Sequence, residues 1–306
     1  MLTMEYLADL VAAHPGAAAV RVREFSVGGR PLAFNERPAI MGVVNLSADS
    51  WYRESVCLAV DQAVQRGRVL HAQGADLVDV GAESSLAHAA RVGAAGQTSR
   101  LLPVIRGLTA AGVPVSVETY EPAVTRACLE AGAAVLNLTA GAAGETDELF
   151  RLVAAHDAAV ILCHVQGAHV RAVGDFVFTS DPTAMLREYF ARQIERATAL
   201  GVTKIVIDPG LGFYYRNLQD SAVRVRHQMT TFLNTFRLRD LGFPVCHALP
   251  HAFEYFGEEV RSAEAFFAVL AALGRTDLFR THEVPRVRSV LATLRAFVPP
   301  APVKSP

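Results

Sequence analysis

The sequence is poor in the residues that mark disulfide-stapled or metal-rich small proteins. It has four cysteines and one tryptophan among 306 residues, and no two cysteines stand in CxxC spacing. All four lie within or beside apolar segments, which is typical of buried, reduced thiols. We therefore expect neither a disulfide framework nor a cysteine metal site at Cys57, Cys128, Cys163 and Cys246.

An excess of charge of one sign is also lacking, as are long hydrophobic runs. The 29 basic residues nearly cancel the 30 acidic ones, so no overall field favours binding to nucleic acid or to an anionic membrane. No apolar stretch is long enough to span a bilayer, and Glu5 and Asp9 stand where a signal peptide carries basic residues. We expect a soluble, cytoplasmic protein whose anion sites, if it has any, are local.

What the sequence does have is a repeated alternation of short apolar runs with longer amphipathic segments. Apolar residues make up 51% of the chain, enough for a large core. The eight runs are AIMGVV, LVDV, VPVSVE, AAVLN, AAVILCH, KIVID, FPVCH and DLFR. Helical stretches such as 60–73, 122–131, 182–200 and 262–273 lie between them. Strands that are apolar on both faces, each followed by a helix, predict an α/β fold, and eight units predict a (β/α)8 TIM barrel. A doubly wound open sheet is the alternative, although it would not need eight repeats.

An N-terminal extension precedes this pattern. The segment TMEYLADLVAAH has helical spacing, and two alternating runs joined at Gly28 and Gly29 predict a β-hairpin. The expected organisation is a helix and hairpin over residues 1–37, the barrel over 38–298 and a flexible tail over 299–306.

Polar residues follow the apolar runs, at the end of a parallel barrel where active sites form. Taken singly, such residues commonly cap the next helix. Taken together, they indicate a site for a small planar heteroaromatic ligand and an anion. These residues are Asn45, Glu83, Ser84, Ser85, Glu118, Asn137, His164, Gln166, Asp208, His251, Arg280 and His282.

The motifs that hold these residues resemble those of the dihydropteroate synthase family. These pterin-binding barrels join a hydroxymethyl-dihydropterin pyrophosphate to p-aminobenzoate in folate synthesis. The resemblance covers about residues 40–288 and rests on five segments in the family's order. They are IMGVVNLSADSW, DVGAESS, VSVETYEPAVTRACLEAGAAVLNLTAG, IVIDPGLGF and FRTHEV.

The resemblance implies roles for particular residues. Asn45 would lie beside the diphosphate and its Mg2+, under a loop that covers the site. Asp208 would accept the two adjacent donors of the pterin edge, with Asn137 and Glu118 beside it. Ser85, Arg280 and His282 would form the pyrophosphate and amine end. The catalytic set expected from this is Asn45, Arg280, His282 and His251, with Asn45 as the metal ligand.

The chain departs from the family's pattern at four places. Where the family has Ser-Arg-Lys after the seventh strand, this chain has Leu249, Pro250 and His251. Leu86 replaces a loop arginine, Glu118 replaces an aspartate, and Leu138 replaces an aspartate. A charge-assisted hydrogen bond contributes about 1.5–3 kcal/mol, so the lost lysine alone predicts a deficit of about 10- to 150-fold unless another group replaces it.

Three functions therefore remain open. The first is a divergent synthase-like transferase that takes p-aminobenzoate or a related amine; the second is a non-catalytic paralogue that binds pterin or a partner subunit. The third, a methyltetrahydrofolate-binding methyltransferase domain, fits the anion pair and the DPGLGF segment less well. The resemblance also implies a homodimer. Aromatic residues in WYRES and GFYYRNLQDS could stack on a flat ligand or simply pack on the surface.

Overall fold

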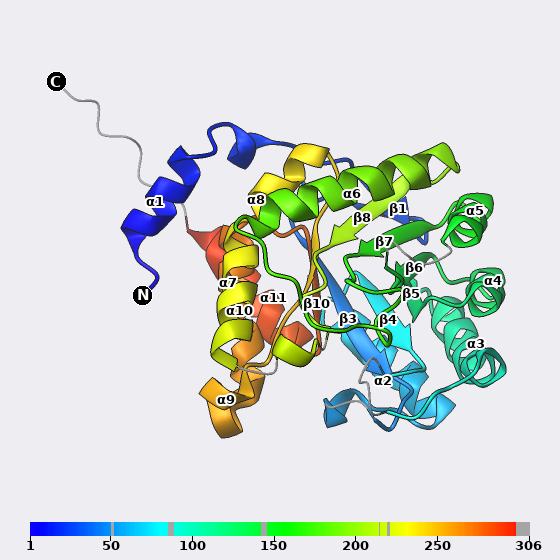
Figure 1. Ribbon diagram of the computed structural model, residues 1–306. Coiled ribbons are helices and arrows are strands. Elements are labelled where there is room, and N and C mark those ends of the chain that lie inside the picture. Colours follow the sequence, from blue (N-terminus) through cyan, green and yellow to red (C-terminus); the bar gives the residue numbers. More distant parts are fainter. Residues whose placement is uncertain (50–51, 85–88, 142–145, 214, 219–220, 298–306) are drawn as a thin grey trace.

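Eight parallel strands surround the centre of the molecule, and helices cover their outer side (Figure 1). The computed structural model describes residues 1–49, 52–84, 89–141, 146–213, 215–218 and 221–297. The barrel strands are β3 (Ala39–Asn45), β4 (Leu77–Gly81), β5 (Val115–Thr119), β6 (Val135–Leu138), β7 (Ala159–Cys163), β8 (Lys204–Asp208), β9 (Cys246–Ala248) and β10 (Leu278–Thr281).

The sheet closes on itself. Its order is β8-β7-β6-β5-β4-β3-β10-β9, with every pair parallel. The two ends of this order meet through a parallel bridge between Ile207 and Val245, where Ile207 N donates to Pro244 O at 3.0 Å. The predicted TIM barrel is confirmed, and the open doubly wound sheet is excluded.

The helices follow the strands along the chain. Asp181 caps the longest of them, α6, by accepting from the backbone N–H groups of Thr183 and Ala184, a common helix start. The α-helices are α1 (Met4–Ala12), α2 (Val60–Ala72), α3 (Ala94–Ala110), α4 (Pro122–Glu130), α5 (Asp147–Ala155), α6 (Pro182–Ala199), α7 (Ser221–Leu233), α8 (Thr235–Leu238), α9 (Phe253–Phe256), α10 (Val260–Leu273) and α11 (Val284–Ala296). Short 3₁₀ turns are η1 (Ala17–Ala19), η2 (Arg53–Ser55), η3 (Arg216–Leu218), η4 (Arg239–Leu241) and η5 (Gly257–Glu259).

The core has two layers because the strands bury both faces. Strands β4, β6 and β7 are buried at every position. Residues such as Val78 and Val117 pack outward against the helices, whereas Met41, Leu77 and Val206 fill the barrel interior. The four cysteines are buried and free, as the sequence predicts. Within the described residues, no helix is both long and apolar enough to cross a membrane.

The N-terminal extension has the predicted helix and hairpin. Strands β1 (Phe25–Val27) and β2 (Arg30–Leu32) pair antiparallel across Gly28 and Gly29, whose φ angles are +56° and +77°. Such left-handed turns favour glycine, because it has no Cβ to clash. Val27, Leu32 and Phe34 join the inner core layer, so the hairpin closes the N-terminal end of the barrel. The domain limits at 37 and 38 stay a prediction, and residues 299–306 lie outside the described part.

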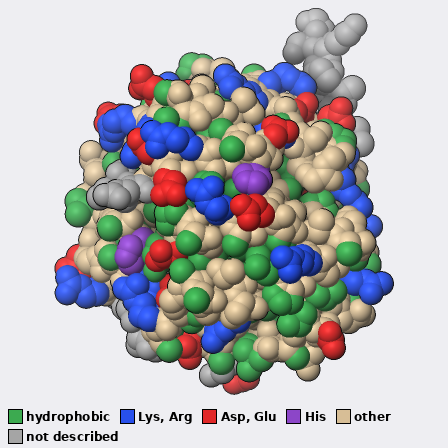
Figure 2. Space-filling model, turned by 90° about the vertical axis from the view of Figure 1, so that its right-hand side faces the viewer, with side chains coloured by type: hydrophobic (Ala, Val, Ile, Leu, Met, Phe, Trp, Pro, Cys, Tyr) green, Lys and Arg blue, Asp and Glu red, His purple; other side chains and the backbone are tan. Residues whose placement is uncertain are grey.

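The surface mixes charges of both signs. Figure 2 shows the face on the right-hand side of Figure 1, where α3, α4 and α5 lie, with basic and acidic side chains interspersed. This agrees with the near-zero net charge of the sequence.

A buried ion pair joins the N-terminal segment to the end of the barrel away from the polar residues. Arg239 and Asp277 approach to 3.1 Å, with 1% and 4% of their side chains exposed. Arg239 also donates to Val20 O at 2.8 Å, and Asp277 accepts from Val245 N at 2.9 Å. Burial raises the pKa of Asp277 to about 6, although Arg239 opposes the shift. The pair connects residues that lie far apart in the sequence.

Removing one member of this pair should destabilise the whole barrel. Arg239→Ala leaves the Asp277 carboxylate buried without its cation, which typically costs about 3–5 kcal/mol of unfolding free energy. Urea denaturation measures the effect. The control Arg151→Ala removes an exposed arginine of a loose 3.9 Å pair, so we expect a change within about 0.5 kcal/mol. Equal losses in the two variants would contradict this role for Arg239.

Candidate functional site

Eight of the residues predicted from sequence line one pocket at the carboxyl ends of the strands. They come from the ends of six strands, and the barrel brings them together although up to 237 positions of chain separate them, from residue 45 to residue 282. The eight are Asn45, Glu83, Ser84, Glu118, Asn137, Asp208, Arg280 and His282. The convergence expected from the strand-end rule is therefore observed.

Asp79 contacts two residues that line this pocket, Asn137 and Arg280, and it was not among the residues predicted from sequence. Its side chain is fully buried on β4. Oδ2 accepts from Arg280 Nε at 2.8 Å and from Asn137 Nδ2 at 3.0 Å, and Oδ1 accepts from Ser116 Oγ at 2.6 Å. A buried carboxylate is costly unless it is paired, so these three donors explain its place. The signal in the sequence was an acidic residue inside the apolar run LVDV.

Arg280 joins Asp79 to a second carboxylate. Its Nη2 donates to Glu118 Oε2 at 2.7 Å, so one guanidinium bridges β4, β5 and β10. Burial alone would lower the pKa of Arg280, but the two carboxylates raise it above its usual value. Burial raises the pKa of Glu118 to about 7; Arg280 opposes the shift, while Asp79 and Asp208 add to it. Near neutral pH, Glu118 is therefore the group of this network that exchanges a proton.

Asp208 ends β8 and faces the same pocket. Its Oδ1 accepts from Gly210 N at 2.7 Å. Gly210 has φ +78°, and a Cβ there would meet His164 O at 2.2 Å, so the tight turn that holds Asp208 requires glycine. Burial raises the pKa of Asp208 to about 6, although the Gly210 N–H and Arg280 both lower it. Nearby, the Asn137 amide oxygen accepts a 3.4 Å contact from Cys163 Sγ.

Asn45 ends β3 at the side of the pocket. Its amide nitrogen donates to Ser55 Oγ at 2.6 Å, and Ser55 Oγ in turn donates to Tyr52 O at 2.7 Å. These bonds tie the first loop to the strand end. The prediction that this loop is a mobile cover is not tested. Ser85, predicted for the anion end, lies outside the described residues, as does Leu86.

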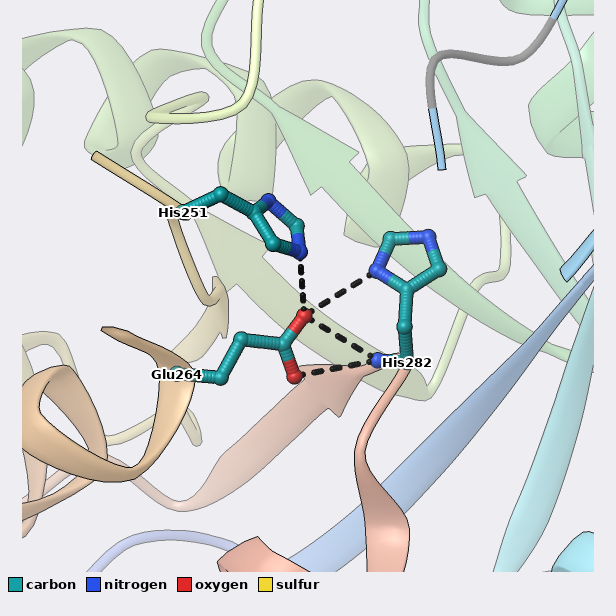
Figure 3. Close-up of side chains that lie close together, drawn as sticks. All are labelled: His251, Glu264 and His282. Atoms are coloured by element: carbon teal, nitrogen blue, oxygen red, sulfur yellow. Dashed lines mark hydrogen bonds and ion pairs between the residues drawn. The ribbon is translucent and has the colours of Figure 1, made fainter. Parts of the chain in front are cut away.

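Three polar residues, His251, Glu264 and His282, lie close together, and His282 also lines the pocket (Figure 3). His251 Nε2 lies 2.7 Å from Glu264 Oε1, and His282 Nδ1 lies 3.1 Å from the same oxygen. Burial lowers the pKa of His282, although Glu264 opposes the shift. Tyr52 stacks on the His282 ring with centroids 4.4 Å apart, and its hydroxyl donates to Glu283. Glu264 was missed because it lies within a helix, where no strand-end signal exists.

The segment after β9 holds the residues Leu249, Pro250 and His251. Leu249 is buried and His251 pairs with Glu264. Arg224 of α7 lines the second pocket at this end, together with His251, Arg280 and His282. Arg224 donates to both carboxylate oxygens of Glu254, at 2.8 and 2.7 Å. A second arginine besides Arg280 therefore lines this pocket, although the sequence gave no spacing that pointed to it.

One of the loop aromatics packs into the interior. Tyr215 is 2% exposed in a cluster with Phe176 and Leu218, and its hydroxyl accepts from Gln166 N at 2.9 Å. Of the two alternatives for the loop aromatics, stacking on a ligand or packing against the protein, Tyr215 therefore shows packing. Trp51 and Tyr214 lie outside the described residues.

Known proteins resemble this chain in sequence and in fold. The sequence model of pterin binding enzymes matches residues 41–247. Dihydropteroate synthase type-2 of Escherichia coli is 31% identical over 268 residues, covering 86% of this chain and 97% of that protein. The Mycobacterium leprae dihydropteroate synthase is 31% identical over 272 residues, covering 86% of this chain and 94% of that protein.

A solved structure of a dihydropteroate synthase has the same fold as this chain. Xanthomonas albilineans dihydropteroate synthase with 4-aminobenzoic acid superimposes with a TM-score of 0.75 at 29% identity, covering 90% of this chain and 98% of that chain. The chain belongs to the pterin-binding enzyme family that contains the dihydropteroate synthases.

Proposed function

We propose that this chain condenses a hydroxymethyl-dihydropterin pyrophosphate with p-aminobenzoate or a related amine and releases pyrophosphate. Its membership of the synthase family supports a transferase of this type. Relatives have been solved with 4-aminobenzoic acid and with 7,8-dihydropteroate. The observation that carries the proposal is that Asn137, Asp208 and Arg280, which come from three different strands, line one pocket.

The pterin edge would bind at Asp208 and Asn137. An amino-pyrimidine presents adjacent donors, which one carboxylate accepts together, and an amide both donates and accepts. Both side chains are at most 5% exposed, so these bonds would form away from competing water. Glu118 lies on β5 directly beside Asn137 of β6, so its carboxyl group would lie near the same edge of the pterin ring.

The leaving group would lie toward Arg280 and His282. In the reaction the C–O bond to the pyrophosphate breaks, and its electron pair leaves with the anion. The amine nitrogen then attacks the pterin methylene carbon and loses a proton to water. A donor aimed at the departing anion lowers the barrier because negative charge grows there. No protein nucleophile is needed, so Arg280 and His282 would act by charge and position.

We also propose Mg2+ as the metal of this reaction, with Asn45 as its protein ligand. The bond from the Asn45 amide nitrogen to Ser55 orients the amide at the pocket wall, and a neutral oxygen is a ligand that Mg2+ accepts. Mg2+ usually takes one or two protein ligands plus phosphate oxygens and water, so this sparse donor set fits it. When bound, the ion would neutralise charge on the pyrophosphate.

A second candidate is a paralogue that binds pterin without turnover. Arg280 already pairs with two carboxylates, which reduces the positive charge it offers to an anion. The cations of the family's strand-seven motif are absent as well. This candidate differs from the first in predicting that pterin pyrophosphate binds and that pyrophosphate is not released.

Two further proposals concern assembly and location. An apolar groove between α1, α7 and α10 includes Tyr255 and Phe266, which are 61% and 44% exposed. We propose that this groove is the homodimer interface, which sedimentation of the full chain would test. A cytoplasmic location stays a prediction.

Asp208→Asn should weaken binding of pterin pyrophosphate by about 10- to 150-fold, the value of one charge-assisted interaction. The amide replaces an acceptor with a donor that opposes the pterin's own donors, while its oxygen can still accept from Gly210. Isothermal titration calorimetry measures the affinity. Asp61→Asn makes the same change on an exposed side chain in the first turn of α2 and should leave affinity unchanged. Unaltered binding by Asp208→Asn would refute the pterin assignment.

Glu118→Gln should change how stability depends on pH. Because the pKa of Glu118 is higher in the folded protein than its ordinary 4.5, its stabilising contribution is complete below pH 4.5 and is lost as pH rises through about 7. The neutral amide cannot lose a proton. The free energy of unfolding of the variant should therefore rise relative to wild type between pH 4.5 and pH 8, by on the order of 3 kcal/mol.

Urea denaturation of both proteins across this pH range gives that difference, in which titrating groups remote from Glu118 cancel. Parallel curves would show that Glu118 titrates normally.

A further inference from the structure

The cluster of His251, Glu264 and His282 has a composition and geometry that the proposed pterin chemistry does not explain, although that chemistry places His282 beside the leaving group. The three residues come from the segment after β9, from α10 and from the end of β10 (Figure 3). One imidazole nitrogen from each histidine and one carboxylate oxygen lie within 4.8 Å of one another. Their side chains are 5%, 0% and 11% exposed in chain order. Two imidazoles and a carboxylate in so small a space are the donors of open transition-metal sites.

The carboxylate is held in one orientation. Glu264 Oε2 accepts from the Thr281 hydroxyl, from His282 N at 3.1 Å and from Glu283 N at 3.1 Å. These donors turn Oε1 toward both imidazole rings. Hydrogen bonds that orient a ligand in this way are a regular feature of protein metal sites.

The buried negative charge of Glu264 is also costly unless a positive group lies beside it. Among the described residues, its ion-pair contacts are the two imidazoles, which balance it only if protonated. The neighbouring arginines serve other carboxylates: Arg280 pairs with Asp79 and Glu118, and Arg261 pairs with Glu283. A bound divalent ion would balance the carboxylate with both imidazoles neutral.

We propose that His251, Glu264 and His282 bind one divalent transition-metal ion of the Zn2+ class. Ligand atoms about 2.1 Å from a tetrahedral ion stand about 3.4 Å apart. The two N···O distances here, 2.7 and 3.1 Å, are shorter, so the imidazole nitrogens would move away from the carboxylate oxygen by about 0.3–0.7 Å when an ion binds. Imidazole nitrogen favours Zn2+, Fe2+ or Co2+ over Mg2+, so this site differs in kind from the oxygen site at Asn45.

The location of this metal site suggests that the ion binds an anionic substrate group. This role for the ion rests on the proposed function. His251 and His282 line a pocket that Arg280 also lines. Three protein ligands leave positions open for an oxygen of the substrate. The ion would supply positive charge at the end of the barrel where the family's Arg-Lys pair is missing, and so would hold the pyrophosphate or an anionic acceptor.

The test measures metal directly. The full chain is stripped with a chelator, incubated with Zn2+, desalted and assayed for metal by mass spectrometry. We expect one Zn2+ per wild-type chain and at least a roughly 100-fold lower affinity in His251→Ala and in Glu264→Gln. Substitution with Co2+ should give visible absorption bands in the wild type that both variants lack. His156→Ala removes an exposed histidine at the end of α5 and should retain the metal.

Circular dichroism shows whether each variant is folded, and His251→Ala, whose side chain lies in a loop, decides the matter if Glu264→Gln unfolds. Wild-type protein that retains no Zn2+, or that retains it equally without His251, overturns the proposal and leaves the cluster as a hydrogen-bonded group. Because no pterin is present, this failure is separate from failure of the proposed function, which Asp208→Asn tests.

Discussion

The bridge that Arg280 makes between Asp79 and Glu118 holds the site together. Without Arg280, two carboxylates would lie in the barrel with no positive partner, and burial of an unpaired charge costs several kcal/mol. Asp79 in turn positions Asn137 and is itself held by Ser116. The four strands that supply these residues are β4, β5, β6 and β10, so one charge network sets the relative positions of groups that pterin would contact.

The same bridge limits what Arg280 can do for an anion. A guanidinium shared by two carboxylates offers less positive charge than a free one. The raised pKa of Glu118 partly relieves this, because a proton on Glu118 removes one of the two negative charges. Binding of an anionic substrate near Arg280 would raise that pKa further by repulsion. If an anionic substrate binds beside Arg280, its binding would therefore be accompanied by proton uptake at Glu118.

Much of the site follows from the sequence because parallel barrels place strand ends together. Asn137 and Asp208 were identified in this way, since each ends an apolar run and each proved to line the pocket. Asp79 was missed because it lies inside a strand, whereas the strand-end rule considers only the residues that follow each run. Glu264 escaped for a different reason: its helix, α10, is amphipathic, and only the folded structure turns that position toward His251 and His282. Residues of a helix and of two loops that meet in the fold can be any distance apart in the sequence. No spacing rule could therefore have predicted this contact.

Release of pyrophosphate is the measurement that tests the central claim most directly. Wild-type protein is incubated with hydroxymethyl-dihydropterin pyrophosphate and Mg2+, with and without p-aminobenzoate, and pyrophosphate is assayed over time. The account predicts catalytic release, with formation of the condensed pterin product when an accepted amine is present. Tight binding of the pterin pyrophosphate without release under either condition would contradict a transferase and identify a binding paralogue.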